Sequence, residues 1–158
     1  MSIHNKKQSV TIPGNQTEIR AVGLTDTGLV RDHNEDAFSI LKDVGLFIVS
    51  DGMGGHQGGE LASRMVVETL PLILTSELPA SLNVDENQSI YALRKAIWDL
   101  SRLVHRKGSE TPGLRGMGAT IVACLIRREI ATIAHMGDSR AYLLRKGFLE
   151  QLTEDHTI

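Results

Sequence analysis

Two different spacings of apolar residues along the chain predict strands near both ends and helices between them. The spacing is helical in two central segments, which run from 60 to 74 and from 90 to 104. Short apolar or alternating runs, which predict strands, occur at 18–25, 37–41, 46–50, 119–126, 130–135, 140–144 and 148–152. This order of strands, helices and strands predicts an α+β fold built in layers.

The limits of the two predicted helices follow from local residue types. Pro71 lacks a backbone N–H, so we expect it to end or kink the first helix near Leu70. Residues 76–88 are polar and predict a loop. Gly108 suits the end of the second helix, which we expect to form an antiparallel pair with the first, lying on a sheet. Trp98 is off the centre of its apolar face and is expected to be only partly buried.

A predicted hairpin brings acidic residues together. The turn 42–45 joins the strands 37–41 and 46–50, and in an antiparallel hairpin the start of one strand lies beside the end of its partner. Glu35 and Asp36 stand at the start of the first strand, and Asp51 stands at the end of the second. Folding therefore places three carboxylates at one edge of the hairpin.

Asp51 opens a glycine-rich stretch, with glycines at 52, 54, 55, 58 and 59. A carboxylate at the end of a buried strand risks desolvation, which a cation can compensate. Glycines let the backbone approach a ligand closely, so Asp51 and the Gly52 backbone are candidates to hold a metal ion. A tight turn with a capping acid is the alternative. A nucleotide-binding loop at 52–59 is disfavoured, because neither of the usual phosphate-loop spacings is present.

The candidate chemistry is metal-assisted attack on a phosphate. Asp138 is a fourth acid at a predicted strand end, and oxygen ligands of this kind suit Mg²⁺ or Mn²⁺ rather than zinc. Two such ions can bind a phosphoryl oxygen and acidify a water that then attacks phosphorus. The guanidinium of Arg31 can hold two phosphate oxygens, although it could instead pair with Asp32 or Glu35 on the surface.

Composition narrows the possible partners. The 158 residues are 41% hydrophobic and carry a net charge of −2, which is typical of one globular domain. The chain has no excess of basic residues that would indicate binding to nucleic acid or to a membrane surface. Residues 1–17 are polar and predict a flexible tail rather than a signal peptide, and no stretch is long enough to span a membrane. We therefore expect a cytoplasmic protein.

Five segments, in this order, resemble those of one enzyme family. They are 31–36 (Arg-Asp-His-Asn-Glu-Asp), 51–56 (Asp-Gly-Met-Gly-Gly-His), 116–120 (Gly-Met-Gly-Ala-Thr), 137–140 (Gly-Asp-Ser-Arg) and 152–156 (Leu-Thr-Glu-Asp-His). Together they resemble the metal-dependent protein serine/threonine phosphatases (PPM, type 2C) in their bacterial form. The resemblance covers roughly residues 19 to 158.

This resemblance implies an α-β-β-α sandwich, in which two antiparallel sheets are flanked by antiparallel helices. It implies two or three Mn²⁺ or Mg²⁺ ions in a cleft at one end. By match, Asp51 would bridge two ions, the Gly52 carbonyl would ligate one, and Asp138 would support a third, weaker site. The substrates would be proteins phosphorylated on serine or threonine, as part of a system with a cognate Ser/Thr kinase that the enzyme opposes in bacterial signalling.

The remaining matched positions have roles of the same kind. Glu35 and Asp36 would bind a metal directly or through its waters, and Arg31 would hold the substrate phosphate. Met53 stands where the eukaryotic pattern has a histidine that is proposed as general acid. His56, three residues further on, is a weaker candidate for the proton donor, and packing against the glycine-rich turn is the favoured role for it.

The family's catalytic domain is longer than this chain. Its C-terminal part supplies two more metal-binding aspartates, in an Asp-Gly and an Asp-Asn segment, and these have no counterpart here. Residues 18–158 thus correspond to the N-terminal portion of a phosphatase 2C-type catalytic domain, and the sandwich is expected to be incomplete at its C-terminal side. The alternative function is a truncated, non-catalytic module that binds a phosphoprotein or another partner without turnover.

Overall fold

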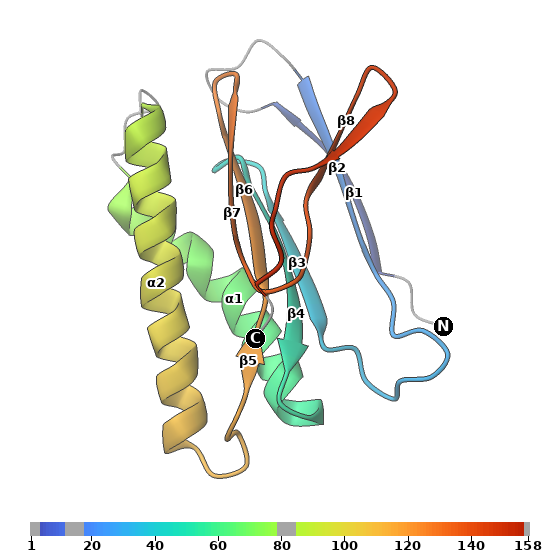
Figure 1. Cartoon of the computed structure of the whole chain (residues 1–158), viewed down its shortest axis with the longest axis vertical. Helices are drawn as coiled ribbons and strands as arrows, with labels where there is room; N and C mark the ends of the chain where they lie inside the picture. The colour runs from blue at the N-terminus through green and yellow to red at the C-terminus, as the bar shows by residue number, and fades with distance from the viewer. Residues whose placement is uncertain (1–3, 12–17, 79–84, 157–158) are drawn as a thin grey trace.

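An antiparallel sheet forms the centre of the computed structural model, which describes residues 4–11, 18–78 and 85–156 (Figure 1). Four strands neighbour one another in the order β3, β4, β6 and β7, and a short fifth strand, β5, pairs with the end of β4. Their bounds are β3 Asp36–Leu41, β4 Leu46–Met53, β5 Gly118–Ala119, β6 Ile121–Arg127 and β7 Ile130–Met136. The predicted hairpin is therefore the pair β3–β4.

Two helices cover one face of this sheet, namely α1 (His56–Glu77) and α2 (Glu86–Glu110) (Figure 1). Burial alternates along β4, because successive side chains of a strand point to opposite faces of the sheet. Leu46 and Ile48 face the helices and are buried, whereas Val49 and Asp51 are exposed. The core is formed by apolar side chains from both helices, β4 and β6, including Val66, Leu70, Leu74, Leu93, Leu100, Ile121 and Leu125.

Two two-stranded ribbons lie on the other side of the central strands in Figure 1. One pairs β1 (His4–Thr11) with β2 (Glu18–Thr25), and the other pairs β8 (Tyr142–Arg145) with β9 (Phe148–Gln151). Apolar side chains on both ribbons are exposed, with Leu24 62%, Leu144 69% and Phe148 80% accessible. The predicted α+β class with antiparallel sheets and a pair of helices is confirmed.

The first helix is longer than its apolar pattern predicts. It begins at His56, so Gly58 and Gly59 are helical, and it continues through Pro71 to Glu77. The prediction allowed Pro71 to end or to kink the helix near Leu70; the first is wrong, and the kink stays a prediction. The helix continues because it buries Leu70 and Leu74 completely. Burying two leucines contributes about 3–6 kcal/mol, which offsets the cost of about 3 kcal/mol for an internal proline.

The ends of the chain and the helix connection also differ from the sequence expectations. Strand β1 occupies part of the segment 1–17 that the polar composition predicts as a tail, and the rest of that segment is outside the described residues. Strand pairing uses backbone groups, so it does not require an apolar run. In the predicted loop 76–88, residues 79–84 are outside the described residues, while α2 starts with a capping box between Asp85 and Gln88.

No helix within the described ranges combines the length and the apolar character needed to cross a bilayer.

Candidate active site

The predicted meeting of acids at the hairpin edge is present. Asp36, the first residue of β3, is paired directly with Asp51 near the end of β4. Asn34 holds the start of β3 in place, because its Oδ1 accepts the Asp36 backbone N–H at 3.0 Å while its Nδ2 donates to the Thr25 hydroxyl at 2.7 Å. The position of the Asp36 carboxylate is thus determined by the ladder and by a side-chain brace to β2.

Close backbone contacts bring Glu35 and the start of α1 to the same edge. The Gly52 N–H donates to the Glu35 carbonyl at 3.1 Å. A Cβ at Gly52 would collide with the Gly59 carbonyl oxygen, and a Cβ at Gly59 would meet the Glu35 carboxylate. These two glycines are therefore required for β4 and α1 to approach each other, and the Glu35 side chain lies against the first turns of α1.

A cavity of about 610 Å³ opens at this edge. Among the described residues that line it are five acids: Asp26, Asp32, Glu35, Asp36 and Asp51. The same lining contains Arg31, His33 and the backbone of Gly52 to Gly55. Such an excess of carboxylates over basic groups, with oxygen atoms as the available donors, fits a hard divalent cation such as Mg²⁺ or Mn²⁺.

The electrostatic environment of Asp51 also favours a cation at this site. Its pKa is raised above the usual value, first by partial desolvation at the end of β4 and then by the charges of Asp36 and Asp138 and a hydrogen bond with the Asp36 carboxyl. Arg31 partly offsets the increase in the pKa. The side chain is nevertheless exposed to solvent, so an ion can reach it. Asp138, Asp36 and Arg31 thus all lie within electrostatic range of Asp51.

Thr120 connects Asp51 with the turn that carries Asp138. The Thr120 hydroxyl accepts the Asp51 N–H at 2.9 Å, and the Thr120 N–H donates to the Asp51 carbonyl at 2.8 Å. The same hydroxyl lies 2.7 Å from the Ser139 hydroxyl, and the Thr120 carbonyl accepts the Ser50 hydroxyl at 2.7 Å. One buried threonine therefore joins β4 to the 137–139 turn.

A second set of contacts holds that turn from outside. The Arg140 guanidinium binds both carboxylate oxygens of Asp155, with its Nη2 2.6 Å from Oδ2 and its Nε 2.9 Å from Oδ1. The His156 N–H donates to the Gly137 carbonyl at 3.0 Å, and the His156 ring stacks on His135 with centroids 4.7 Å apart. The segment 152–156 therefore braces the Asp138 turn.

The predicted ligand set is only partly assembled. Asp36 and Asp51 adjoin, and the charge of Asp138 acts on Asp51, but the Glu35 carboxylate is turned toward Gly59. In the described part of the chain there is no group of three or more His, Cys, Asp or Glu side chains that could hold an ion by itself. His56 is the first residue of α1, but its side chain is outside the described residues, so its proton-donor role stays a prediction.

Several residues that position this site are not among the site residues that the sequence predicts. Asp26 lines the cavity, and its carboxylate accepts the Gly28 N–H in a turn that an Asp-Thr-Gly sequence can indicate. Thr120 and Asp155 lie inside matched segments, yet nothing in their local sequence shows that they reach Asp51 or Arg140. Those contacts join residues far apart in the chain, which periodicity does not detect.

Residues 30–157 match the Protein phosphatase 2C family. The chain belongs to that family. It is 39% identical over 137 residues to the serine/threonine phosphatase stp of Listeria monocytogenes, a match covering 85% of this chain and 53% of that protein. It is 37% identical over 139 residues to the serine/threonine protein phosphatase PstP of Mycobacterium tuberculosis, covering 88% of this chain and 25% of that protein.

Solved phosphatase 2C structures have a similar fold over the part that this chain covers. The crystal structure of M. tuberculosis PstP superposes with a TM-score of 0.69 at 32% identity, covering 98% of this chain and 55% of that one. The PstP catalytic domain in complex with two manganese ions gives a TM-score of 0.64 at 33% identity, covering 98% and 56%. This phosphatase 2C chain thus spans about half the length of the Listeria relative and of these structures.

Proposed function

We propose that this chain carries the phosphate- and metal-binding part of a protein serine/threonine phosphatase that hydrolyses phosphoserine and phosphothreonine in proteins. The observation that carries the proposal is the pairing of Asp36 with Asp51 at the rim of a cavity lined by acids and by Arg31. The phosphatase names of the Listeria and Mycobacterium relatives support the same activity.

Mn²⁺ or Mg²⁺ is the proposed cofactor, because the cavity offers oxygen donors and the PstP catalytic domain has been solved with two manganese ions. When bound, such ions acidify a water for attack on phosphorus and stabilise the charge on the phosphoryl oxygens. Asp51 and the Gly52 carbonyl are the proposed primary ligands, with Asp36 and Glu35 beside them and Asp138 as the support for a further ion.

Arg31 is the proposed phosphate-binding residue. It is exposed, it lines the cavity, and its charge acts on Asp51. A guanidinium can hold two oxygens of a phosphate monoester at once, and its positive charge favours the charge that develops in the transition state. Arg31 would hold the substrate phosphate near the acidic edge, and its positive charge would stand between the phosphate and the carboxylates.

The second candidate function is a module that binds a phosphoprotein or another partner without turnover. The absence of a complete cluster of three ligating side chains from the described residues favours it. A phosphorylated protein is the substrate under the first function and one of the possible partners under the second. The substrate's cognate Ser/Thr kinase and a cytoplasmic location are further parts of the proposal, supported by the bacterial relatives.

The deciding experiment compares two proteins: the chain as given, and the same chain extended by the C-terminal segment of the Listeria relative. Release of phosphate from a phosphothreonine peptide is measured with Mn²⁺ and with EDTA. Metal-dependent release by the unextended chain supports an enzyme that is active by itself, and release by the extended protein alone shows that this chain is an inactive piece of the enzyme. If neither protein releases phosphate, the catalytic proposal is wrong. Arg31→Ala is expected to reduce turnover in whichever protein is active.

A further inference from the structure

The outer surface of α2, on the side away from the sheet, is basic and aromatic. This helix has three acids, of which Glu86 and Glu110 stand at its two ends and Asp99 near its middle. Between the two ends it has five basic residues, namely Arg94, Lys95, Arg102, Arg106 and Lys107. Trp98 is 66% exposed and Tyr91 is 58% exposed. A cationic helix surface on a chain with a net charge of −2 is not accounted for by the phosphate site on the opposite face of the sheet.

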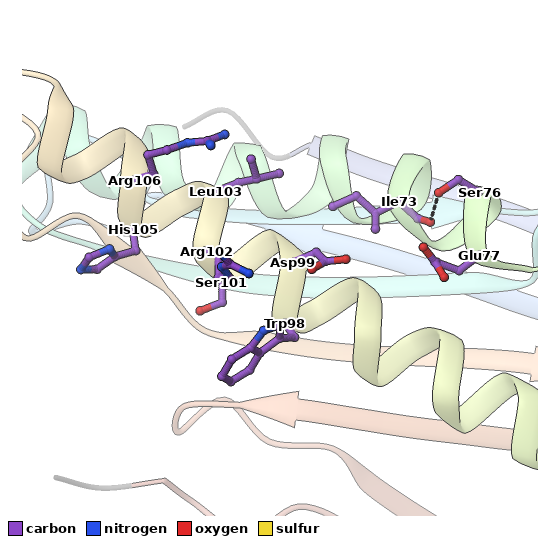
Figure 2. A pocket seen from close by; sticks show the side chains of 10 residues that line it. All are labelled: Ile73, Ser76, Glu77, Trp98, Asp99, Ser101, Arg102, Leu103, His105 and Arg106. Atoms are coloured by element: carbon purple, nitrogen blue, oxygen red, sulfur yellow. Dashed lines mark hydrogen bonds between the residues drawn. The ribbon is translucent and has the colours of Figure 1, made fainter.

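A groove of about 770 Å³ runs along this surface between α1 and α2 (Figure 2). Figure 2 shows Ile73 and Glu77 of α1 beside Asp99 of α2, with Leu103 and Arg106 further along α2. Trp98 and Arg102 also line the groove. Its lining therefore combines apolar side chains with guanidinium groups.

The charges in the groove are unequally paired. Lys95 donates to the Glu77 carboxylate at 2.5 Å and to the Asp99 carboxylate at 3.2 Å, so it partly neutralises both acids. Within the described residues, Arg102 and Arg106 form no ion pair. Because they are one helical turn apart, their guanidinium groups are available on the same side of α2. The charge left to attract a partner is therefore positive.

We propose that this groove binds an acidic segment of a partner protein, with apolar side chains against Trp98 and Leu103 and carboxylates on Arg102 and Arg106. Tryptophan and arginine are the residues that most often dominate binding energy at protein interfaces, and guanidinium groups match carboxylates in geometry. The carboxylates of Glu77 and Asp99 stand inside the groove. Lys95 binds both of these carboxylates, so they repel an acidic segment less than unpaired acids would.

The groove and the acidic cavity are separate sites. Their linings share no residue, and α1 packs on the face of β4 opposite to the Asp51 side chain. Substitutions at Arg102 and Arg106 are therefore expected to leave hydrolysis of a small phosphate ester unchanged. The binding measurement does not depend on catalytic activity, so failure of the proposed function would leave this inference standing.

Trp98 is the only tryptophan of the chain, so its fluorescence reports directly on the groove. The probe is a short synthetic peptide of alternating glutamate and leucine, and its counterpart contains lysine in place of glutamate. We expect a saturable blue shift of the emission with the glutamate peptide and none with the lysine peptide. The shift should be lost near 1 M salt, where the screening length falls to about 3 Å. The absence of a saturable change with the glutamate peptide would overturn the proposal.

Two double variants with the same change in net charge sharpen the test. Arg102→Glu with Arg106→Glu should raise the Kd of the glutamate peptide about tenfold. The control is Arg115→Glu with Arg145→Glu, which are exposed and outside the groove, and it should leave the Kd nearly unchanged. Equal weakening by both variants would show that only net charge matters, and the proposal would fail. It would also fail if a single-stranded oligonucleotide of the same charge bound as tightly as the peptide.

Circular dichroism checks that each variant keeps its helices. If the charge reversal unfolds the chain, the pair Arg102→Gln with Arg106→Gln replaces it. That pair removes the attraction to the peptide without adding carboxylates that repel Asp99 and Glu77, and it should still raise the Kd several-fold. An unchanged Kd in that folded variant would also contradict the assignment.

Discussion

Asp36 and Asp51 occupy directly opposed positions on neighbouring strands, β3 and β4, and Asp138 adds a third negative charge nearby. Like charges opposite one another destabilise a ladder. The pKa of Asp51 is raised first by partial desolvation and then by the charges of Asp36 and Asp138. Under the proposed function, a divalent cation bound at these carboxylates would convert their repulsion into attraction. Stability without metal and affinity for metal are thus expected to oppose each other at these residues.

Asp51→Asn is expected to stabilise the metal-free chain slightly while abolishing metal-dependent phosphatase activity. A folded-state pKa above the ordinary value means that folding is favoured when Asp51 is protonated, so stability falls as pH rises through the folded pKa. Asparagine cannot ionise, so the variant does not lose this stability as pH rises. The unfolding temperature at pH 7 should therefore rise, but only by about 1–2 °C because the side chain is exposed. Thermal unfolding without Mn²⁺ measures the stabilisation, and release of phosphate in the presence of Mn²⁺ measures the loss of activity. In addition, Mn²⁺ should raise the unfolding temperature of the parent chain only.

Asp43→Asn is the matched control for this variant. Asp43 is an exposed acid in the turn at the other end of the same hairpin, so its substitution should change neither the metal-free stability nor the response to Mn²⁺. An equal stabilisation of Asp51→Asn and the parent by Mn²⁺ would show that Asp51 is not a ligand.

Thr120→Val should weaken the connection between β4 and the Asp138 turn. Valine has a similar shape, but it leaves the Asp51 N–H without its hydroxyl acceptor and removes the contact with Ser139. Loss of a buried hydrogen-bond partner of this kind costs about 1–3 kcal/mol in the free energy of unfolding, which urea denaturation measures.

Thr120→Ser separates the hydroxyl from the methyl group in that experiment. Thr120→Val should also weaken Mn²⁺ binding, because the backbone of Asp51 loses its hydroxyl acceptor. Serine keeps the hydroxyl, so Thr120→Ser should restore that affinity even if the missing methyl group lowers stability somewhat. If the serine variant were as impaired in metal binding as the valine variant, the packing of the methyl group would be the cause and not the hydrogen bond.

Gly52→Ala is expected to disrupt the junction of β4 and α1. The added Cβ would overlap the backbone carbonyl of Gly59, which cannot move without displacing the first turn of α1. A loss of about 3 kcal/mol or more in the free energy of unfolding is expected. Gly118→Ala is the control, since its Cβ would meet the flexible end of the Met53 side chain at 3.1 Å. Equal stability of the two variants in urea would refute the close-approach argument.

Low pH is expected to weaken the contact between Asp155 and Arg140, which holds the turn that carries Asp138 in place. The hydrogen bonds from Arg140 hold the pKa of Asp155 below its usual value, so this carboxylate contributes stability above the unfolded-state pKa and loses it as pH falls through the folded one. Urea denaturation at pH 7 and below pH 4 should therefore show a smaller pH dependence for Asp155→Asn than for the parent. Glu150→Gln, at an exposed position on β9, should keep the parent's pH dependence.

Local residue patterns predicted the elements better than their limits. The apolar run 46–49 predicted β4, and the helical spacing of apolar residues predicted both helices. Pro71 led to a wrong helix boundary, because the hydrogen bond lost at a proline costs less free energy than the burial of Leu70 and Leu74 contributes. How deeply these leucines are buried depends on the packing of α1 against β4 and α2. Strand β1 was missed because backbone pairing with β2 leaves no apolar signature in its own residues.

The sequence by itself determined the α+β class, the family, and the meeting of Asp36 with Asp51, since each depends on order and spacing along a short stretch of chain. Three contacts were decided only by the tertiary structure. Thr120 joins Asp51 to the turn that carries Asp138. The Glu35 carboxylate lies near Gly59, and Arg140 forms an ion pair with Asp155. Those contacts connect residues up to 69 positions apart. Their geometry comes from how the helices, the sheet and the ribbons pack together, which no local pattern specifies.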